Sequence, residues 1–464
     1  MSLNSISPLD GRYSKQTSAL SSFFSERALM SYRVRVEGEY LIALSLLKLK
    51  LRKFTEKEKS AIRSLYNLSD KDAQMISNIE KKGYKSGKRL IKATDHDVKA
   101  VEYFIKEKLS KTSLKNSLEW VHFALTSEDV NNISYALMIA DSLDNVIKPK
   151  LVEIIKELNK LSKKYKNLPM LARTHGQPAS PTTFGKEIKV FTARIEKRMK
   201  GLASISIQAK QNGATGNWNA HMVAYPNIDW QRFSKKFIEN FNKGRTQKLE
   251  ANLITTQIEC HDSYVAVFDT LRRINTILID FNQDIWRYIS DEWVIQKPVT
   301  GTVGSSTMPH KINPIKFENS EGNLSIANAM FEFFARKLPI SRLQRDLTDS
   351  TIQRNIGSAF AHSLVAYEYL LSGLSKIEVN KTKITEVLNS HPEVVAEAIQ
   401  TILRREGIAF PYEKLKTLTQ GKKVTMGDFV NFINELPVSE KIKKELSLIT
   451  PKNYIGLARL IASK

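Results

Sequence analysis

The sequence predicts an all-α protein, and two observations on its 464 residues carry this prediction. Glycine and proline are scarce: 19 and 14 residues make about 7% of the chain, where ordinary usage gives about 12%. The stretch from Arg245 to Lys297 contains neither, and apolar side chains recur within it at alternating steps of three and four. This spacing predicts one very long helix with a single apolar seam, formed by Tyr264, Val267, Leu271, Ile274, Leu278, Phe281, Ile285 and Tyr288.

Two further stretches are poor in helix breakers. Ser117 to Tyr165 is interrupted only by Pro149, and Lys186 to Asn212 only by Gly201. Helices longer than the average of about 11 to 12 residues need packing partners, and they predict a bundle. No strand alternation of comparable length competes with this interpretation.

The distribution of breakers predicts three sections. Residues 1–116 mix shorter helical runs with a charged segment, Lys81 to Arg89, that we expect to be a loop. Residues 117–372 contain the long helices. Residues 373–464 contain short helical runs separated by prolines and glycines. We therefore expect a small N-terminal domain, a central long-helix domain and a small C-terminal domain.

Composition limits the class of protein. With 42% hydrophobic and 26% charged residues the chain is globular, and its single cysteine, Cys260, forms no internal disulfide and is expected to be a small buried hydrophobe. Residues 1–30 have no apolar core of signal-peptide length, and no window is long and apolar enough for a membrane span, so a soluble cytoplasmic protein without a membrane partner is expected. The net charge of +23 comes from lysines scattered along the helical stretches with few aromatic residues between them. This pattern favours a solvated surface over a nucleic-acid partner.

Polar residues gather where glycine and proline interrupt the helices. Thr174 and His175 precede the first such segment, Gly176 to Gly185, and histidine is the side chain best able to move a proton near neutral pH. A histidine beside a turn is also commonly a structural hydrogen-bonding group. The segment from residue 301 to 323 is rich in small and hydroxylated residues and contains Lys311, which predicts a mobile loop that closes over an anionic ligand. A flexible surface linker is the alternative.

An arginine cluster places Ser350 between Arg345 and Arg354. Guanidinium forks match carboxylate or phosphate, although an ion-paired surface helix explains the pattern equally well. Asp10-Gly11-Arg12-Tyr13 and Asp95-His96-Asp97 are polar groups of the kind that cap helices and turns.

Motifs for cofactors are missing from the sequence. No histidine pair has helical zinc-ligand spacing, and neither a nucleotide phosphate loop nor a dinucleotide-binding fingerprint is present. We therefore expect no metal and no cofactor.

The segment Gly304 to Pro314 resembles the signature loop of the fumarase, aspartase and argininosuccinate lyase superfamily. Within it the chain resembles the longer bacterial branch of the adenylosuccinate lyase family, because His310 precedes Lys311 where the sister families are expected to have glycine or glutamine. The resemblance covers essentially the whole chain. It extends to Ser7 to Tyr13, His96 to Phe104, Thr126 to Asp129, Thr174 to Pro178, Asn212-Gly213, Thr256 to Glu259 and Arg345 to Asn355.

The resemblance implies a cofactor-independent C–N lyase of purine biosynthesis. Its small-molecule substrates are adenylosuccinate, which gives AMP and fumarate, and the succinyl-carboxamide ribotide, which gives the carboxamide ribotide. The reaction needs a base, fixed positive charge for the carbanion and an acid for the departing nitrogen. In this family Ser305 corresponds to the general base and His175 to the general acid. The other implied catalytic residues are Lys311, Glu318, which orients His175, and His96.

The resemblance also assigns binding residues. Thr126, Ser127 and Gln257 correspond to groups that hold the succinyl or fumarate oxygens. The nucleotide and its phosphate are implied to contact Arg12, Tyr13, Arg345, Ser350 and Arg354. Further implied site residues are Asp95, His96, Asp97, Thr174, Ser306, Thr307, Met308 and Asn313. Asp95 departs from the expected asparagine or arginine, and Cys260 departs from the expected proline.

The family fold implies three helical domains whose long central helices form the twenty-helix core of a homotetramer. Each active site then combines segments of three subunits. Three alternatives stay open: a sister enzyme such as argininosuccinate lyase, an inactive structural relative, and a nucleic-acid-binding module. Intact Ser305, Lys311, His175 and Glu318 disfavour the inactive relative.

Overall fold

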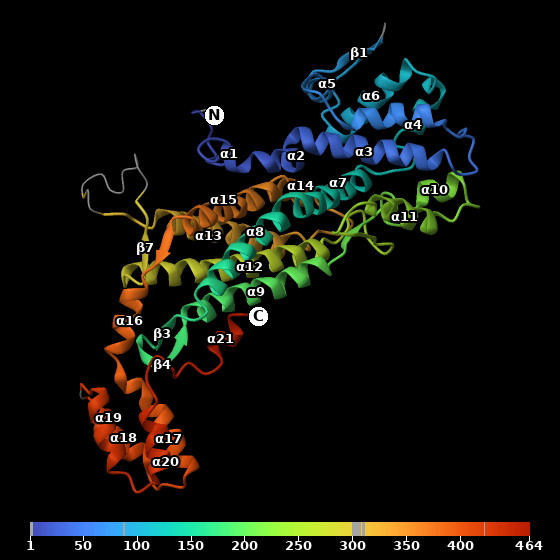
Figure 1. Cartoon of the computed structure of the whole chain (residues 1–464). Coiled ribbons are helices and arrows are strands. Elements are labelled where there is room, and N and C mark those ends of the chain that lie inside the picture. The colour runs from blue at the N-terminus through green and yellow to red at the C-terminus, as the bar shows by residue number, and fades with distance from the viewer. Residues whose placement is uncertain (1–2, 87–88, 299–307, 309–310, 422) are drawn as a thin grey trace. The chain divides into compact units, whose positions relative to one another are not determined.

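The computed structural model describes residues 3–86, 89–298, 308, 311–421 and 423–464, and it is built mainly of helices (Figure 1). The predicted all-α class is confirmed. In the described residues the strands form only two-stranded pairs, β1 with β2, β3 with β4, β5 with β6 and β7 with β8. The chain forms two compact units. The first comprises Met1–Leu151, Arg198–Thr276 and Gly322–Glu368, and the second Val152–Lys197, Ile277–Glu321 and Tyr369–Lys464.

The first unit contains short and medium helices around the predicted binding residues. Its elements are α1 (Ser14–Thr17), α2 (Ser21–Phe24), α3 (Glu26–Leu44), α4 (Glu56–Arg63), α5 (Asp70–Lys81), β1 (Tyr84–Ser86), β2 (Arg89–Ile91), α6 (Asp97–Ser110), α7 (Ser127–Ser142), β5 (Ile207–Ala209), α10 (Asn219–Ala224), α11 (Trp230–Glu239), β6 (Leu249–Ala251) and α14 (Thr348–Gln353).

The second unit contains the longest hairpin and the C-terminal helices. Its elements are β3 (Pro169–Thr174), β4 (Gln177–Thr183), β7 (Val294–Gln296), β8 (Ile377–Val379), α16 (Lys381–Asn389), α17 (Ala396–Arg405), α18 (Pro411–Thr419), α19 (Met426–Asn434), α20 (Glu440–Ser447) and α21 (Ala458–Ile461). Five long helices have residues in both units: α8 (Lys148–Lys164), α9 (Phe184–Ala203), α12 (Asp262–Ser290), α13 (Ile315–Lys337) and α15 (Ile356–Leu374).

Helix α12 confirms the predicted seam. It has 29 residues and is therefore about 44 Å long. The seam residues from Tyr264 to Ile285 are at most 1% exposed. In the first unit Phe268 of α12 lies 5.5 Å from Phe331 and 6.4 Å from Phe360 between ring centroids, so aromatic packing joins α12 to α13 and α15. The helix stays regular because no glycine or proline interrupts it.

The other long stretches are more broken than predicted. Within Ser117 to Tyr165 the α-helix begins only at Ser127, because His122 and Ala124 have positive φ and terminate the preceding 3-10 turn. A π-helical turn at Leu143–Ile147 then joins α7 to α8. Pro149 explains this widening, since it cannot donate a hydrogen bond to the carbonyl of the fourth residue before it.

Two smaller predictions also need adjustment. Helix α9 ends at Ala203, and β5 replaces the predicted helix end. The charged segment Lys81 to Arg89 contains the short strand β1 and the first residue of β2, where we expected only a loop.

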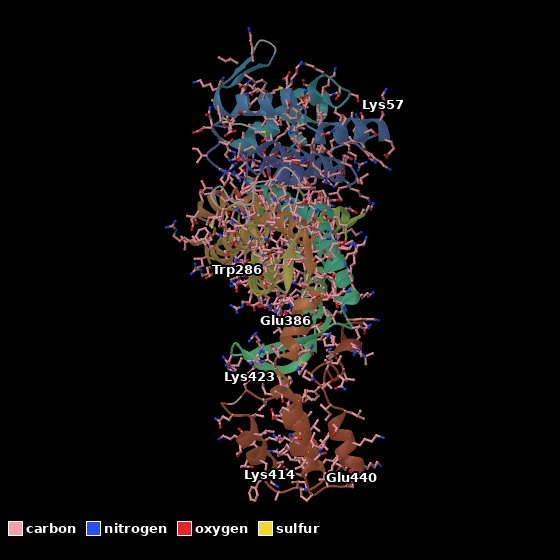
Figure 2. All side chains as sticks on the ribbon, turned by 60° about the vertical axis from the view of Figure 1, so that its left-hand side comes forward. Lys57, Trp286, Glu386, Lys414, Lys423 and Glu440 are labelled. Atoms are coloured by element: carbon pink, nitrogen blue, oxygen red, sulfur yellow. The ribbon has the colours of Figure 1, made fainter. Side chains whose placement is uncertain are left out.

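Short helices follow β8, as predicted. Helices α17 to α20 pack around Leu403, Leu415 and Phe429, while charged side chains such as Lys414 and Glu440 point outward (Figure 2). The predicted division into residues 1–116, 117–372 and 373–464 stays a prediction. In the described part of the chain no helix is both long and apolar enough to cross a membrane.

Candidate active site

His175 lies at the tip of the β3–β4 hairpin in the second unit. Thr174 pairs with Gln177, so His175 and Gly176 form a two-residue turn, with φ of 54° and 75°. Two positive φ values are what a type I′ hairpin turn requires. Thr174 and His175 are exposed, and His175 has no hydrogen bond or ion pair with any described residue. The turn therefore presents the imidazole to a ligand or to another chain.

The hairpin is anchored on both sides of this turn. The Arg173 guanidinium donates to the Gly176 carbonyl at 3.1 Å and lies over the Trp293 ring, 5.9 Å from its centroid. Trp293 is 3% exposed and gives the arginine a fixed support. Further down the hairpin, Leu171 packs into the core of the C-terminal helices. The tip is thus held by a rigid base.

The predicted signature loop is described only in part. Ser305, Ser306 and Thr307, together with His310, lie outside the described residues. Met308 and Lys311 are exposed, and Asn313 is half-buried. Gln296, before the residues left undescribed, donates from Nε2 to the carbonyl of Ile312 at 2.7 Å.

Glu318 lies in the first turn of α13, just after this segment. Its Oε1 accepts a hydrogen bond from the Trp286 indole at 3.2 Å, and the carboxylate is exposed. Among the described residues Glu318 and His175 make no contact with each other. The predicted orienting role stays a prediction.

In the first unit, the start of α6 brings two predicted site residues together. His96 is the N-cap: its Nδ1 accepts the backbone N–H of Lys99 at 3.2 Å. Because this nitrogen accepts a hydrogen bond, the proton of the neutral ring lies on Nε2, which is 3.4 Å from the Ser127 hydroxyl. Asp95 is exposed and has a positive φ of 45°, and its carboxylate forms no ion pair with the neighbouring His96.

Asp97 and Arg354 form the centre of an ion-pair group. The Arg354 guanidinium donates to Asp97 at 2.7 Å and to both oxygens of Glu26 at 2.8 and 3.0 Å, while Arg33 donates to Asp97 at 2.8 Å. Burial alone would raise the pKa of Asp97, but Arg33 and Arg354 hold it below its usual range. The group therefore contains two carboxylates, Asp97 and Glu26, and two guanidinium groups, Arg33 and Arg354.

Arg354 lies between two cavities of this unit. One of about 390 Å³ is also lined by Glu26, Arg33 and Asp97. The other, of about 480 Å³, is lined by Ser21 of α2, by Ser25 just after it and by Asp10 of the N-terminal motif. In the same motif Arg12 is exposed and Tyr13 is half-buried. A guanidinium beside a cavity suits an anionic ligand.

Thr126, Ser127 and Gln257 are half-buried, and Thr126 caps α7. The Thr126 backbone N–H donates to the Asp129 carboxylate at 2.9 Å. This bond fixes the first turn of α7, from which Thr126 and Ser127 project.

Arg345 has internal partners. Its guanidinium lies 3.0 Å from Glu128 and 3.3 Å from Asp349 and is 13% exposed. Burial raises the pKa of Glu128 to about 7, against the opposing effect of Arg345. Ser350, which donates its backbone N–H to Asp349, is half-buried in α14. The predicted nucleotide-binding roles of Arg345 and Ser350 stay predictions.

One group in the described part of the chain has the side-chain types that hold a metal. Glu128, His261 and Asp349 are buried, with ligand atoms within 4.8 Å of one another. The guanidinium of Arg345 lies within ion-pair distance of both acidic side chains and supplies positive charge there. The expectation of no metal stays a prediction.

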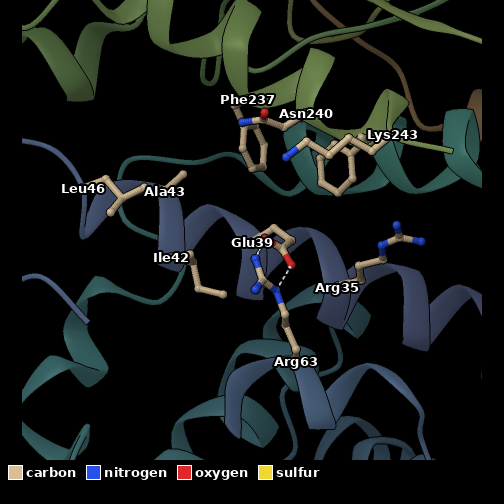
Figure 3. A pocket seen from close by; sticks show the side chains of 10 residues that line it. Arg35, Glu39, Ile42, Ala43, Leu46, Arg63, Phe237, Asn240 and Lys243 are labelled. Carbon is tan, nitrogen blue, oxygen red and sulfur yellow. Dashed lines mark hydrogen bonds and ion pairs between the residues drawn. The ribbon is translucent and has the colours of Figure 1, made fainter. Parts of the chain in front are cut away.

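A further cavity contains none of the predicted site residues. It measures about 340 Å³ and is lined by α3, α4, α11 and the turn after α11 (Figure 3). Figure 3 shows the Arg63 side chain reaching Glu39, at 2.8 and 3.1 Å. Both ends of this pair are thereby satisfied.

Sequence reasoning missed three residues that hold these groups in place. Arg33 and Glu26 lie on α3, where nothing distinguishes them from surface charges. Lys210 is fully buried beside Asp129, yet in the sequence it is one lysine among many. Its place next to the Asn212-Gly213 segment is the one signal that marks it.

Comparison with known proteins identifies the chain. A profile of the lyase family matches residues 11–328, and a profile described as adenylosuccinate lyase C-terminal matches residues 341–455. The chain is 50% identical to the adenylosuccinate lyase of Dictyostelium discoideum, over 98% of this chain and 97% of that protein. It is 45% identical to the adenylosuccinate lyase of Escherichia coli K12, with the same coverage. The chain belongs to the adenylosuccinate lyase family.

Solved structures of the superfamily have the same fold. A fumarate lyase from a Mesorhizobium species superposes with a TM-score of 0.73 at 16% identity, covering 96% of each chain. A 3-carboxy-cis,cis-muconate lactonizing enzyme from Pseudomonas putida gives a TM-score of 0.69 at 18% identity. The predicted family and its C–N lyase class are confirmed, and the nucleic-acid module and sister-lyase alternatives lose their support.

Proposed function

We propose that this protein cleaves adenylosuccinate to AMP and fumarate, and cleaves the succinyl-carboxamide ribotide in the same way. The observation that carries the proposal is the identity of 45% to 50% with adenylosuccinate lyases over nearly the whole chain. In each reaction a proton leaves the succinyl carbon next to a carboxylate. Its electron pair forms the new C=C bond, the C–N bond breaks, and the nitrogen takes up a proton.

Two residues carry the proton transfers in this proposal. Ser305 accepts the carbon-bound proton and His175 protonates the departing nitrogen. The exposed position of His175 on a rigid hairpin tip supports its role, because an acid must reach the leaving group without reorganisation. Lys311, Asn313 and the donors of Ser306, Thr307 and Met308 stabilise the charge that develops on the carboxylate.

Binding is divided between the two ends of the substrate. Arg354, with Arg12, Tyr13, Arg345 and Ser350, holds the nucleotide and its phosphate. Thr126, Ser127 and Gln257 hold the succinyl oxygens. The cavities beside Arg354 support the first assignment, and the half-buried hydroxyls at the start of α7 support the second.

The enzyme is proposed to be a cytoplasmic homotetramer with active sites built from three subunits. Exposed apolar side chains support an assembly: Ile326 and Phe333 are 48% and 47% exposed, seven residues apart on one face of α13, and Trp286 is 45% exposed on α12. Water-exposed aromatic rings on long helices favour helix packing between chains. His175, which has no hydrogen bond or ion pair within the described part of the chain, fits a site completed by another subunit.

The first test is incubation of the purified protein with adenylosuccinate, with no added metal or cofactor, while AMP and fumarate are measured together. Equal amounts of both support the proposal. If neither forms from a protein that sedimentation shows to be tetrameric, the proposed substrate is wrong and argininosuccinate is tried next.

The second test separates the two proton-transfer roles. Asparagine readily adopts positive φ, so His175→Asn keeps the hairpin turn and removes the acid, while Ser305→Ala removes the base. Each variant alone should bind adenylosuccinate but turn it over poorly. Mixed and reassembled, the two variants should regain activity, because some sites then combine an intact Ser305 with an intact His175 from different chains. Near-normal rates in either variant contradict its role, and no recovery on mixing contradicts shared sites.

A further inference from the structure

Lys210 directly follows β5, and its ammonium group is completely buried in the first unit. The side chain is 0% exposed. Its Nζ donates to the carbonyl of Gln257 at 2.8 Å and to the carbonyl of Gly213 at 3.0 Å, and it lies 2.9 Å from Asp129 Oδ1. An ammonium has three donors, and all three are used. Lys210 therefore has no donor left for a substrate and acts only through the groups it holds.

Asp129 extends this contact to three backbone N–H groups. Its carboxylate is 1% exposed and accepts the N–H groups of Thr126 at 2.9 Å, Asn212 at 3.1 Å and Gly213 at 3.2 Å. The Lys210–Asp129 pair thus joins three segments that are separate in the sequence: the start of α7, the 212–216 turn and the loop before α12.

Two of these segments carry the groups that the proposed function assigns to the succinyl oxygens. We propose that Lys210 is a positioning residue that holds Thr126, Ser127 and Gln257 at the spacing of a four-carbon dicarboxylate. The inference rests on the proposed function. It adds a role for a lysine that makes no contact with substrate.

The physical chemistry of the pair favours positioning over plain stability. Removing two charges from water costs free energy, and well-packed apolar side chains often stabilise a core equally well. Hydrogen bonds from an ammonium to two carbonyl oxygens are directional, however. They therefore fix the positions of the two peptide groups, which apolar packing alone would not do. A group that binds carboxylates at a set distance needs this fixation.

The test uses the double variant Lys210→Met with Asp129→Asn. It removes both charges together, while the asparagine oxygen can still accept the Thr126 N–H. We expect the inhibition constant of fumarate and the KM of adenylosuccinate to rise about tenfold to a hundredfold, with the inhibition constant of AMP unchanged. Lys148→Met is the matched control. Lys148 pairs with Asp144 at 2.9 Å in the same unit, without bonds to the three segments, so both constants should stay at wild-type values.

A selective effect on fumarate is the decisive result. If the fumarate constant is unchanged, or if the fumarate and AMP constants rise together, the pair has only a structural role and the inference is wrong. Should the double variant not fold, Lys210→Gln is measured in the same way, with the same expected split. Failure of the wild-type enzyme to cleave adenylosuccinate overturns the proposed function instead, so the two failures are distinguishable.

Discussion

In the proposed function Arg354 binds the substrate phosphate. Glu26, which is paired with Arg354, should then compete with that phosphate, and its removal should tighten substrate binding. In the structure both Glu26 oxygens lie within 3.0 Å of one guanidinium nitrogen of Arg354. A phosphate that takes this nitrogen must first displace the carboxylate. The Glu26 side chain is 66% exposed and that of Arg354 35%, so the pair is solvated and worth about 0.2 to 1 kcal/mol. When this ion pair no longer has to be broken, the affinity for substrate should rise by the same free energy, which corresponds to about 1.5- to 5-fold.

The assay is steady-state cleavage of adenylosuccinate by Glu26→Gln and the wild-type enzyme at low and high salt. KM should fall by the stated factor at low salt, and the gain should shrink as salt screens the pair. Glu39→Gln is the matched control, because Glu39 pairs with Arg63 through a comparable two-oxygen contact outside the site (Figure 3). An unchanged or higher KM in Glu26→Gln, or an equal change in the control, refutes the reasoning.

Three further predictions concern stability and turnover. Burial raises the pKa of Glu128 to about 7, so between about pH 4.3 and 7 the folded state keeps a proton that the unfolded chain releases. The free energy of unfolding should therefore fall by about 3 kcal/mol as the pH rises through this range. Melting temperatures of Glu128→Gln should lack this decline; a parallel decline in both proteins assigns it to another group. Gly216→Ala should lower the free energy of unfolding by about 1 to 3 kcal/mol, because the φ of Gly216 is 76° and a Cβ would lie 2.2 Å from a carbonyl oxygen. Gly201 in α9 has open space around it, so Gly201→Ala should raise the free energy of unfolding by about 0.5 to 1 kcal/mol. Chemical denaturation of both variants measures the contrast, and equal effects would contradict the local explanation. Arg173→Met should lower kcat about tenfold with little change in KM, because the turn that carries His175 loses its anchor; a change in KM alone would place the arginine in substrate binding.

Local patterns predicted the parts of the fold that depend on local rules. The three-and-four spacing from Tyr264 to Tyr288 predicted α12, because a helical period places those residues on one side and burial follows. The start of α7 was harder to predict. Because His122 and Ala124 have positive φ, the helix begins only at Ser127, and neither residue type predicts this backbone conformation.

The candidate site shows the same division. Resemblance to a known family named Arg354 as a site residue, but the sequence does not show which carboxylates are paired with it. Arg33 and Asp97 are 64 positions apart and meet only because α3 packs beside the start of α6. Arg354 lies still further along the chain.

The sequence by itself determined the helical class, the long central seam, the short C-terminal helices and the residue types that the chemistry needs. These properties follow from periodicity, breakers and motifs, each of which acts over a few neighbouring residues. Only the tertiary structure decided that Lys210 is buried with every donor used and that Glu26 is paired with Arg354. It also decided that His175 lies on a left-handed turn with no hydrogen bond or ion pair to any residue the structure describes. The physical reason is that burial and pairing depend on which helices pack together, and a side chain's free energy is set by neighbours that lie far away in the sequence.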